Sequence, residues 1–143
     1  MPRSAIRKFS ANEREILELL KENEKWKQLL SFTTEEINFL QQLLTADIYQ
    51  KNILNMYEKL QLFANELDSF RTENMELTME VHNHRYDIEG MMECEDISCE
   101  VFYHDEHIKL ESHIQDFLQK FRAFKLKIFS STGHAFRRTS KEH

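Results

Sequence analysis

The chain has 143 residues and a formal net charge of −6, with 41% hydrophobic and 31% charged residues. This length is typical of one domain with its own core, and the acidic balance disfavours a nucleic-acid partner, which needs a concentrated basic surface. No apolar run reaches the roughly 18 to 20 residues of a membrane span, and the start lacks a signal peptide, so we expect a soluble protein of the cytoplasm. With only two glycines and one proline to interrupt helices, the sequence predicts an all-α fold.

Two shorter helices are expected before residue 50. Ser10 and Glu13 match a capping box, in which two side chains satisfy free backbone amides at a helix start, and Thr33 and Glu36 repeat that signature. We therefore predict two helices joined by a link at residues 31–32. Apolar residues at helical spacing follow each signature, namely Ile16, Leu20, Trp26 and Leu30 after the first and Ile37, Leu40 and Leu44 after the second.

A long antiparallel helical hairpin is predicted over about residues 56–129. Apolar residues recur at steps of three and four on both sides of an acidic turn at residues 90–96, which places them on one face of each helix. Residues whose numbers add to about 191 should then lie opposite each other. The two stripes contain Leu60, Phe63, Leu67, Phe70, Leu77, Val81 and Ile88 before the turn, and Tyr103, Leu110, Ile114, Phe117, Phe121, Phe124 and Ile128 after it.

The hairpin and the two shorter helices are expected to form one helical bundle. We assign residues 10–130 to a single helical domain, because periodic apolar positions continue through this range. Residues 1–9 and the basic segment 131–143 lack that periodicity, so we expect a flexible N-terminus and a flexible basic tail.

Polar residues interrupt the hairpin stripe at Asn74, His84 and His107. Asn74 has two interpretations: a buried amide that specifies the register or the partner, or a solvated residue at the edge of the bundle. The two histidines should face each other across the hairpin. They are interpreted first as a neutral polar layer in which one imidazole donates a hydrogen bond.

A metal site is the alternative interpretation of the histidine layer. Glu80 and Glu111 lie one helical turn from His84 and His107, and this mixture of imidazole and carboxylate ligands suits a divalent metal such as Zn, Fe or Mn. The Glu-x-x-His pairs of a ferritin-like di-iron site do not occur in the sequence. The predicted metal ligands are therefore His84, His107, Glu80 and Glu111.

Two cysteines, Cys94 and Cys99, flank the predicted turn. They are too few for a secreted disulfide framework, and the acidic residues around them should raise their thiol pKa values. We expect ordinary thiols, with a reversible bridge under oxidation as the alternative.

The acidic turn has two interpretations as well. It is either a solvated surface that favours the start of the returning helix, or an interaction tip that meets a basic surface or a metal held by another protein. The residues of this candidate interaction tip are Met91, Met92, Glu93, Glu95 and Asp96.

No catalytic or nucleotide-binding motif accompanies these features. The sequence favours a small interaction or structural module that is not an enzyme and that self-associates or binds a protein partner through an apolar face of the hairpin. A metal-binding helical bundle is the second hypothesis.

Overall fold

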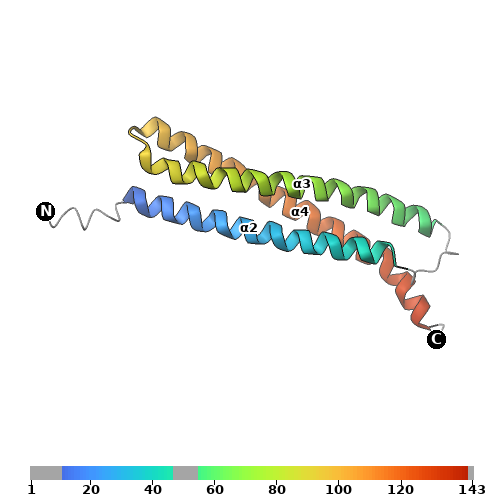
Figure 1. Ribbon diagram of the computed structural model, residues 1–143. Coiled ribbons are helices and arrows are strands. Elements are labelled where there is room, and N and C mark those ends of the chain that lie inside the picture. The colour runs from blue at the N-terminus through green and yellow to red at the C-terminus, as the bar shows by residue number, and fades with distance from the viewer. Residues whose placement is uncertain (1–10, 47–54, 142–143) are drawn as a thin grey trace. The chain divides into compact units, whose positions relative to one another are not determined.

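The computed structural model describes the backbone of residues 11–46 and 55–141 and the side chains of residues 13–46 and 55–133. Within these ranges the chain forms helices and no strand, which confirms the all-α prediction (Figure 1). None of the described helices contains an apolar stretch of the length that a membrane span requires. The elements are α2 (Ala11–Leu44), α3 (Met56–Gly90), the 3-10 helix η2 (Met91–Glu93) and α4 (Ile97–Lys141).

Helix α2 replaces the two shorter helices that were predicted, and the expected link at residues 31–32 is helical. The prediction was wrong because a capping signature permits a helix start without requiring one. Thr33 is buried in the stripe between Leu30 and Ile37, so the stripe continues through the expected link. The buried residues of α2 recur at steps of three and four: Ile16, Leu19, Asn23, Trp26, Leu30, Thr33, Ile37, Leu40 and Leu44.

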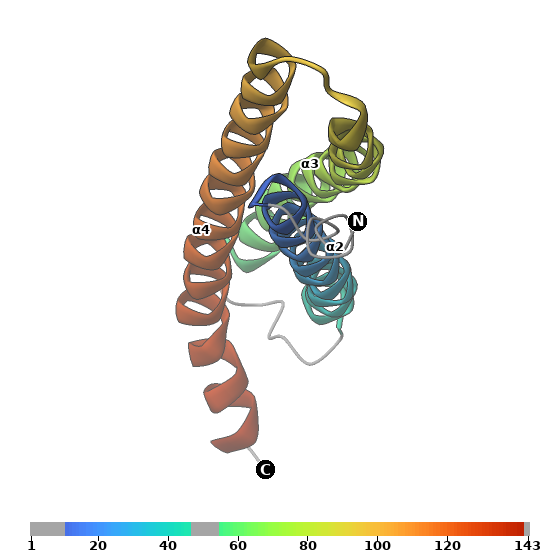
Figure 2. The same cartoon turned by 90° about the vertical axis from the view of Figure 1, so that its left-hand side faces the viewer.

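Helices α3 and α4 form the predicted hairpin, with the turn at η2 (Figure 2). Helix α3 begins at Met56, as expected, and ends at Gly90. The carboxylate Oδ1 of Asp96 accepts a hydrogen bond of 2.9 Å from the backbone N–H of Cys99 and so caps the start of α4. The acidic residue therefore has a structural role at the start of the returning helix.

Helix α4 continues past its predicted end at residue 129 and reaches Lys141. Thr132 is buried, and its hydroxyl donates a hydrogen bond of 2.7 Å to the backbone carbonyl of Ile128. The polar residues Ser130, Ser131 and Thr132 therefore lie inside the helix without ending it. The flexibility expected of residues 131–143 stays a prediction, and the N-terminal segment 1–9 lies outside the described residues.

The structure groups into two compact units, each containing a segment of all three long helices. Unit 1 comprises residues up to 31 together with 76–114, and unit 2 comprises 32–75 together with residues from 115 onward. The expectation of a single folding domain over 10–130 stays a prediction. Unit 1 has a core of Ile16, Leu19, Ile88 and Met91, and unit 2 has a core of Ile37, Leu40, Leu44, Phe63, Leu67, Phe121, Phe124 and Ile128.

The predicted register of the hairpin is confirmed at the histidine pair of unit 1 and holds approximately for the aromatic contacts of unit 2. In unit 2, the ring of Phe70 packs among three phenylalanines of α4, with centroids 4.8 Å from Phe124, 5.4 Å from the predicted partner Phe121 and 6.1 Å from Phe117. In unit 1, His84 and His107 are in direct contact. Asn74 is buried in unit 2, where its Nδ2 donates a hydrogen bond of 2.8 Å to the Thr34 hydroxyl, so the solvated interpretation of this residue is wrong.

Candidate functional site

His84 on α3 and His107 on α4 form a buried pair in unit 1. The two residues are 5% and 3% exposed, and His84 Nε2 lies 2.9 Å from His107 Nδ1. The indole of Trp26 on α2 covers the pair, with its centroid 4.5 Å from that of the His107 ring. The predicted juxtaposition of the two histidines is therefore confirmed.

The surroundings keep both imidazoles neutral near pH 7. Burial, followed by the neighbouring His84, lowers the pKa of His107 from 6.5 to about 4, and Glu111 opposes this shift. Burial also lowers the pKa of His84, although Asp87 and Glu106 act in the opposite direction. A neutral imidazole carries one N–H and one lone pair, so one ring of the pair donates to the other.

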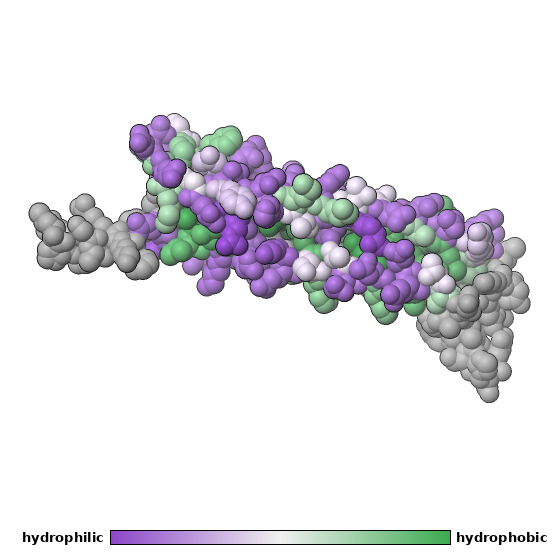
Figure 3. Space-filling model, in the orientation of Figure 1, coloured by the Kyte–Doolittle hydropathy of each residue, from purple (hydrophilic) through white to green (hydrophobic). Residues whose placement is uncertain are grey.

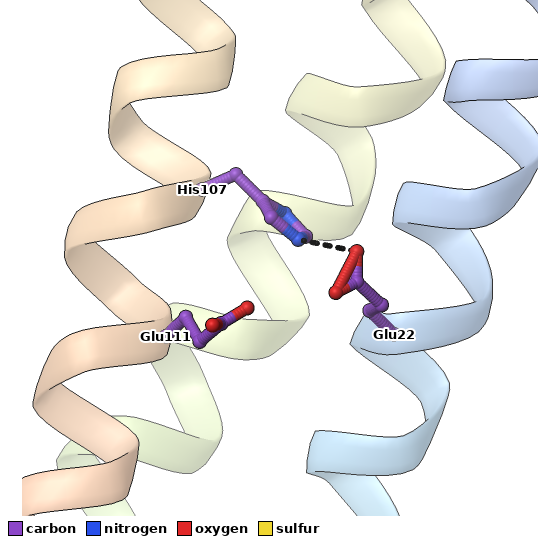
Figure 4. A group of neighbouring side chains, drawn as sticks. All are labelled: Glu22, His107 and Glu111. Carbon is purple, nitrogen blue, oxygen red and sulfur yellow. Dashed lines mark ion pairs between the residues drawn. The ribbon is translucent and has the colours of Figure 1, made fainter.

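The second ring nitrogen of His107 points to two carboxylates (Figure 4). Glu22 on α2 places Oε1 3.4 Å from His107 Nε2, and Glu111 lies one turn further along α4. One ligand atom from each of Glu22, His107 and Glu111 lies within 4.8 Å of the other two. His107 Nε2 is buried and makes no hydrogen bond, since the contact with Glu22 is longer than a well-formed one.

The sequence prediction included two members of this group, His107 and Glu111, and missed Glu22. Glu22 belongs to α2, and the register of the α3–α4 hairpin contains no information about which α2 residue lies beside it. Glu80 is exposed and, together with His84, lines a different cavity of about 240 Å³. His84 is not a member of the group but contacts it through His107.

A buried amide fixes α2 beside this site. Asn23, the residue after Glu22, donates a hydrogen bond of 3.0 Å from Nδ2 to the backbone carbonyl of Val81. Arg85 of α3 also forms an ion pair of 3.7 Å with Glu24 of α2. These contacts hold the α2 segment that carries Glu22 against the hairpin.

The turn that was predicted as an interaction tip divides into buried and exposed residues. Met91 is fully buried in the core of unit 1, so it has no surface to offer to a partner. Met92, Glu93, Glu95 and Asp96 are exposed, and the Asp96 carboxylate caps α4. The role of the exposed residues in binding a partner stays a prediction.

Cys94 and Cys99 form a disulfide at the same turn, which corrects the expectation of ordinary thiols. Because Asp96 starts α4 directly after the turn, the two Cα atoms are only 5.7 Å apart, within the range that a disulfide requires. Disulfides persist in oxidising compartments and are rare in the cytoplasm, and the cytoplasmic location stays a prediction.

Unit 2 carries an apolar groove between α2 and α4, with a volume of about 330 Å³. Three phenylalanines line it and are nevertheless exposed to 64% (Phe32), 59% (Phe39) and 46% (Phe129). Lys125 at the same groove is paired with Glu36. Figure 3 shows patches of hydrophobic surface among the hydrophilic side chains on the face that it draws.

Comparisons with known proteins give no further guidance. No protein-family model matches the chain, and no similar curated protein or solved structure was found. Its function has to be inferred from the chemistry of the described residues.

Proposed function

We propose that this chain is a non-catalytic helical module that associates with a second copy of itself through the groove in unit 2. The observation that carries the proposal is the exposure of Phe32, Phe39 and Phe129 around one groove. Single exposed apolar residues are common on protein surfaces, whereas aromatic side chains gathered at a groove are typical of interfaces.

The spacing on α2 suits pairing with an identical helix. Phe32 and Phe39 are seven residues apart, so they lie on one face two turns from each other. If two copies of α2 pack antiparallel about a two-fold axis midway between these residues, Phe32 of one copy meets Phe39 of the second copy. Each copy then supplies the same patch, as a two-fold symmetric interface requires, in a short coiled-coil contact.

Charged residues flank the groove on both helices. Arg122 lies seven residues before Phe129 and therefore on the same face of α4, and Glu35 lines the groove from α2. Both side chains are exposed, whereas Glu36 and Lys125 already pair within the chain. In the antiparallel arrangement Glu35 of one copy lies opposite Glu36 of the second copy, so the basic Arg122 and Lys125 have to offset the repulsion between these carboxylates.

Sedimentation velocity over a concentration series up to roughly 100 μM tests the proposal, a range that detects even weak dimers. We expect the wild-type chain to form dimers and Phe39→Glu to remain a monomer, because dimerisation would bury the new carboxylate against phenylalanine. Phe102→Glu is the matched control, since Phe102 is 57% exposed but belongs to unit 1. Circular dichroism should show that both variants keep the helical content of the wild type.

Two results would contradict the proposal. One is a wild-type chain that stays monomeric throughout the series. The other is a Phe39→Glu variant that dimerises as strongly as Phe102→Glu, which would place the interface on another surface.

A further inference from the structure

The three-residue group in unit 1 combines one nitrogen and two oxygen donors from two helices (Figure 4). We propose that Glu22, His107 and Glu111 bind a divalent transition-metal ion, with Zn²⁺ as the first ion to test. This proposal goes beyond self-association, because it concerns unit 1 and needs only one copy of the chain.

His107 supplies the nitrogen ligand. Its Nε2 is buried, makes no hydrogen bond and lies beside the two carboxylates. His84 can fix the required tautomer: if His107 Nδ1–H donates to His84 Nε2 across their 2.9 Å contact, the lone pair of His107 Nε2 is free for a metal. Metal-binding histidines commonly donate their second ring N–H in this way, so His84 is a positioning residue.

Glu22 and Glu111 supply the oxygen ligands. Glu111 follows His107 by four residues, which places both side chains on one face of α4. The 3.4 Å between Glu22 Oε1 and His107 Nε2 is close to the roughly 3.3 Å that separates two ligands of a tetrahedral Zn²⁺ with bonds of about 2.0 Å. The Glu22 side chain is 44% exposed, so it has room to adjust around an ion.

The donor set also indicates the class of ion. One imidazole with two carboxylates suits Zn²⁺, Mn²⁺ or Fe²⁺, whereas Ca²⁺ and Mg²⁺ prefer oxygen ligands alone. The two carboxylates carry a formal charge of −2, which matches that of the cation. Three protein ligands leave a fourth position for water.

Isothermal titration calorimetry of the non-reduced full chain with ZnCl₂ tests the site directly. Keeping the protein oxidised retains the Cys94–Cys99 disulfide, so its sulfur atoms cannot bind the ion as thiolates. We expect one Zn²⁺ per chain. Glu22→Gln and Glu111→Gln should each weaken binding at least tenfold, because each substitution removes an anionic ligand while keeping the size of the side chain.

Glu106→Gln is the matched control. Glu106 is partly buried on the same helix but does not belong to the three-residue group. Its Oε1 forms an ion pair of 3.6 Å with Lys109 Nζ. This variant should bind Zn²⁺ as the wild type does. His84→Gln should weaken binding less than the loss of a direct ligand, because it removes only the partner that orients His107.

Cobalt substitution gives a second readout. Four-coordinate Co²⁺ should produce visible absorption bands in the wild type and in Glu106→Gln, and these bands should be lost in the Glu22→Gln/Glu111→Gln double variant. Phe39→Glu should keep both the one-to-one stoichiometry and the cobalt bands, since the ligands come from one chain.

The proposal is overturned if the wild type does not take up Zn²⁺ stoichiometrically. It is also overturned if the double variant binds Zn²⁺ as tightly as Glu106→Gln, since the ions would then be held by other side chains. A result of either kind leaves the sedimentation test of Phe39 unaffected.

Discussion

His84 Nε2 and His107 Nδ1 lie 2.9 Å apart, and both rings are buried beneath Trp26. Two imidazoles in such contact share one hydrogen bond only while at least one of them is neutral. The stability of unit 1 should therefore depend on the protonation of this pair.

The free energy of unfolding should decrease as the pH falls from about 6.5 toward 4. In the folded chain burial lowers the pKa of His107 to about 4 and also lowers that of His84, whereas both titrate near 6.5 when unfolded. Between pH 6.5 and 4 the unfolded chain binds more protons than the folded chain does. The contribution of the two histidines to the free energy of unfolding is therefore fully present above pH 6.5 and decreases as the pH falls below it. The slope should approach about 1.4 kcal/mol per pH unit for each such proton.

Urea unfolding at a series of pH values measures this slope, and His107→Leu separates the histidines from the carboxylates. The variant should be less stable than the wild type at pH 7, because the buried His84 loses its hydrogen-bond partner, but its pH dependence should be shallower. An unchanged slope would assign the acid sensitivity to other groups.

Substitution of Phe121 by Asp should destabilise the chain severely. Phe121 is buried in the core of unit 2 against Phe70, so an unpaired carboxylate there should lower the free energy of unfolding by several kcal/mol. Lys120→Asp is the control, since Lys120 is exposed and should change stability little. Chemical denaturation compares the two, and equal losses would show that the hairpin register is wrong.

Proline at position 31 tests the continuity of α2. Ser31 lies in the interior of a helix that runs from Ala11 to Leu44, so Ser31→Pro should lower stability by about 3 kcal/mol through a lost backbone hydrogen bond and a steric clash. Ser31→Ala should have little effect, because Ser31 is exposed. If both variants unfold at the same urea concentration, residue 31 belongs to a non-helical link between two shorter helices, and α2 is not continuous.

Removal of the disulfide should have a moderate effect. Cys94 and Cys99 close a loop of only six residues, for which the chain-entropy relation gives about 2 kcal/mol. Cys94→Ser/Cys99→Ser should therefore unfold at a lower urea concentration than the oxidised wild type. Wild type kept in reductant should behave like the variant, and a difference between them would indicate a separate role for the thiols.

The periodic apolar residues of the sequence were sufficient to predict the hairpin. They could not predict which residues of α2 lie beside it. The steps of three and four around residues 90–96 were sufficient for the hairpin and for the contact of His84 with His107. The Thr33 signature misled because it is local, while the helix is held by a stripe extending over many turns. Asn23 is a polar residue within the buried stripe of α2. Its position could have indicated that the neighbouring Glu22 lies close to the histidine pair.

The short turn at η2 has a consequence for the order in which the chain folds. Across the hairpin in unit 1, His84 and His107 are only 23 residues apart in sequence, whereas the pair of Glu36 and Lys125 in unit 2 joins residues 89 apart. Closing a shorter loop loses less chain entropy and is faster, so the hairpin contacts nearest the turn should form before those of unit 2. Substitutions at Val81 should then slow folding, while substitutions at Ile37 should mainly accelerate unfolding.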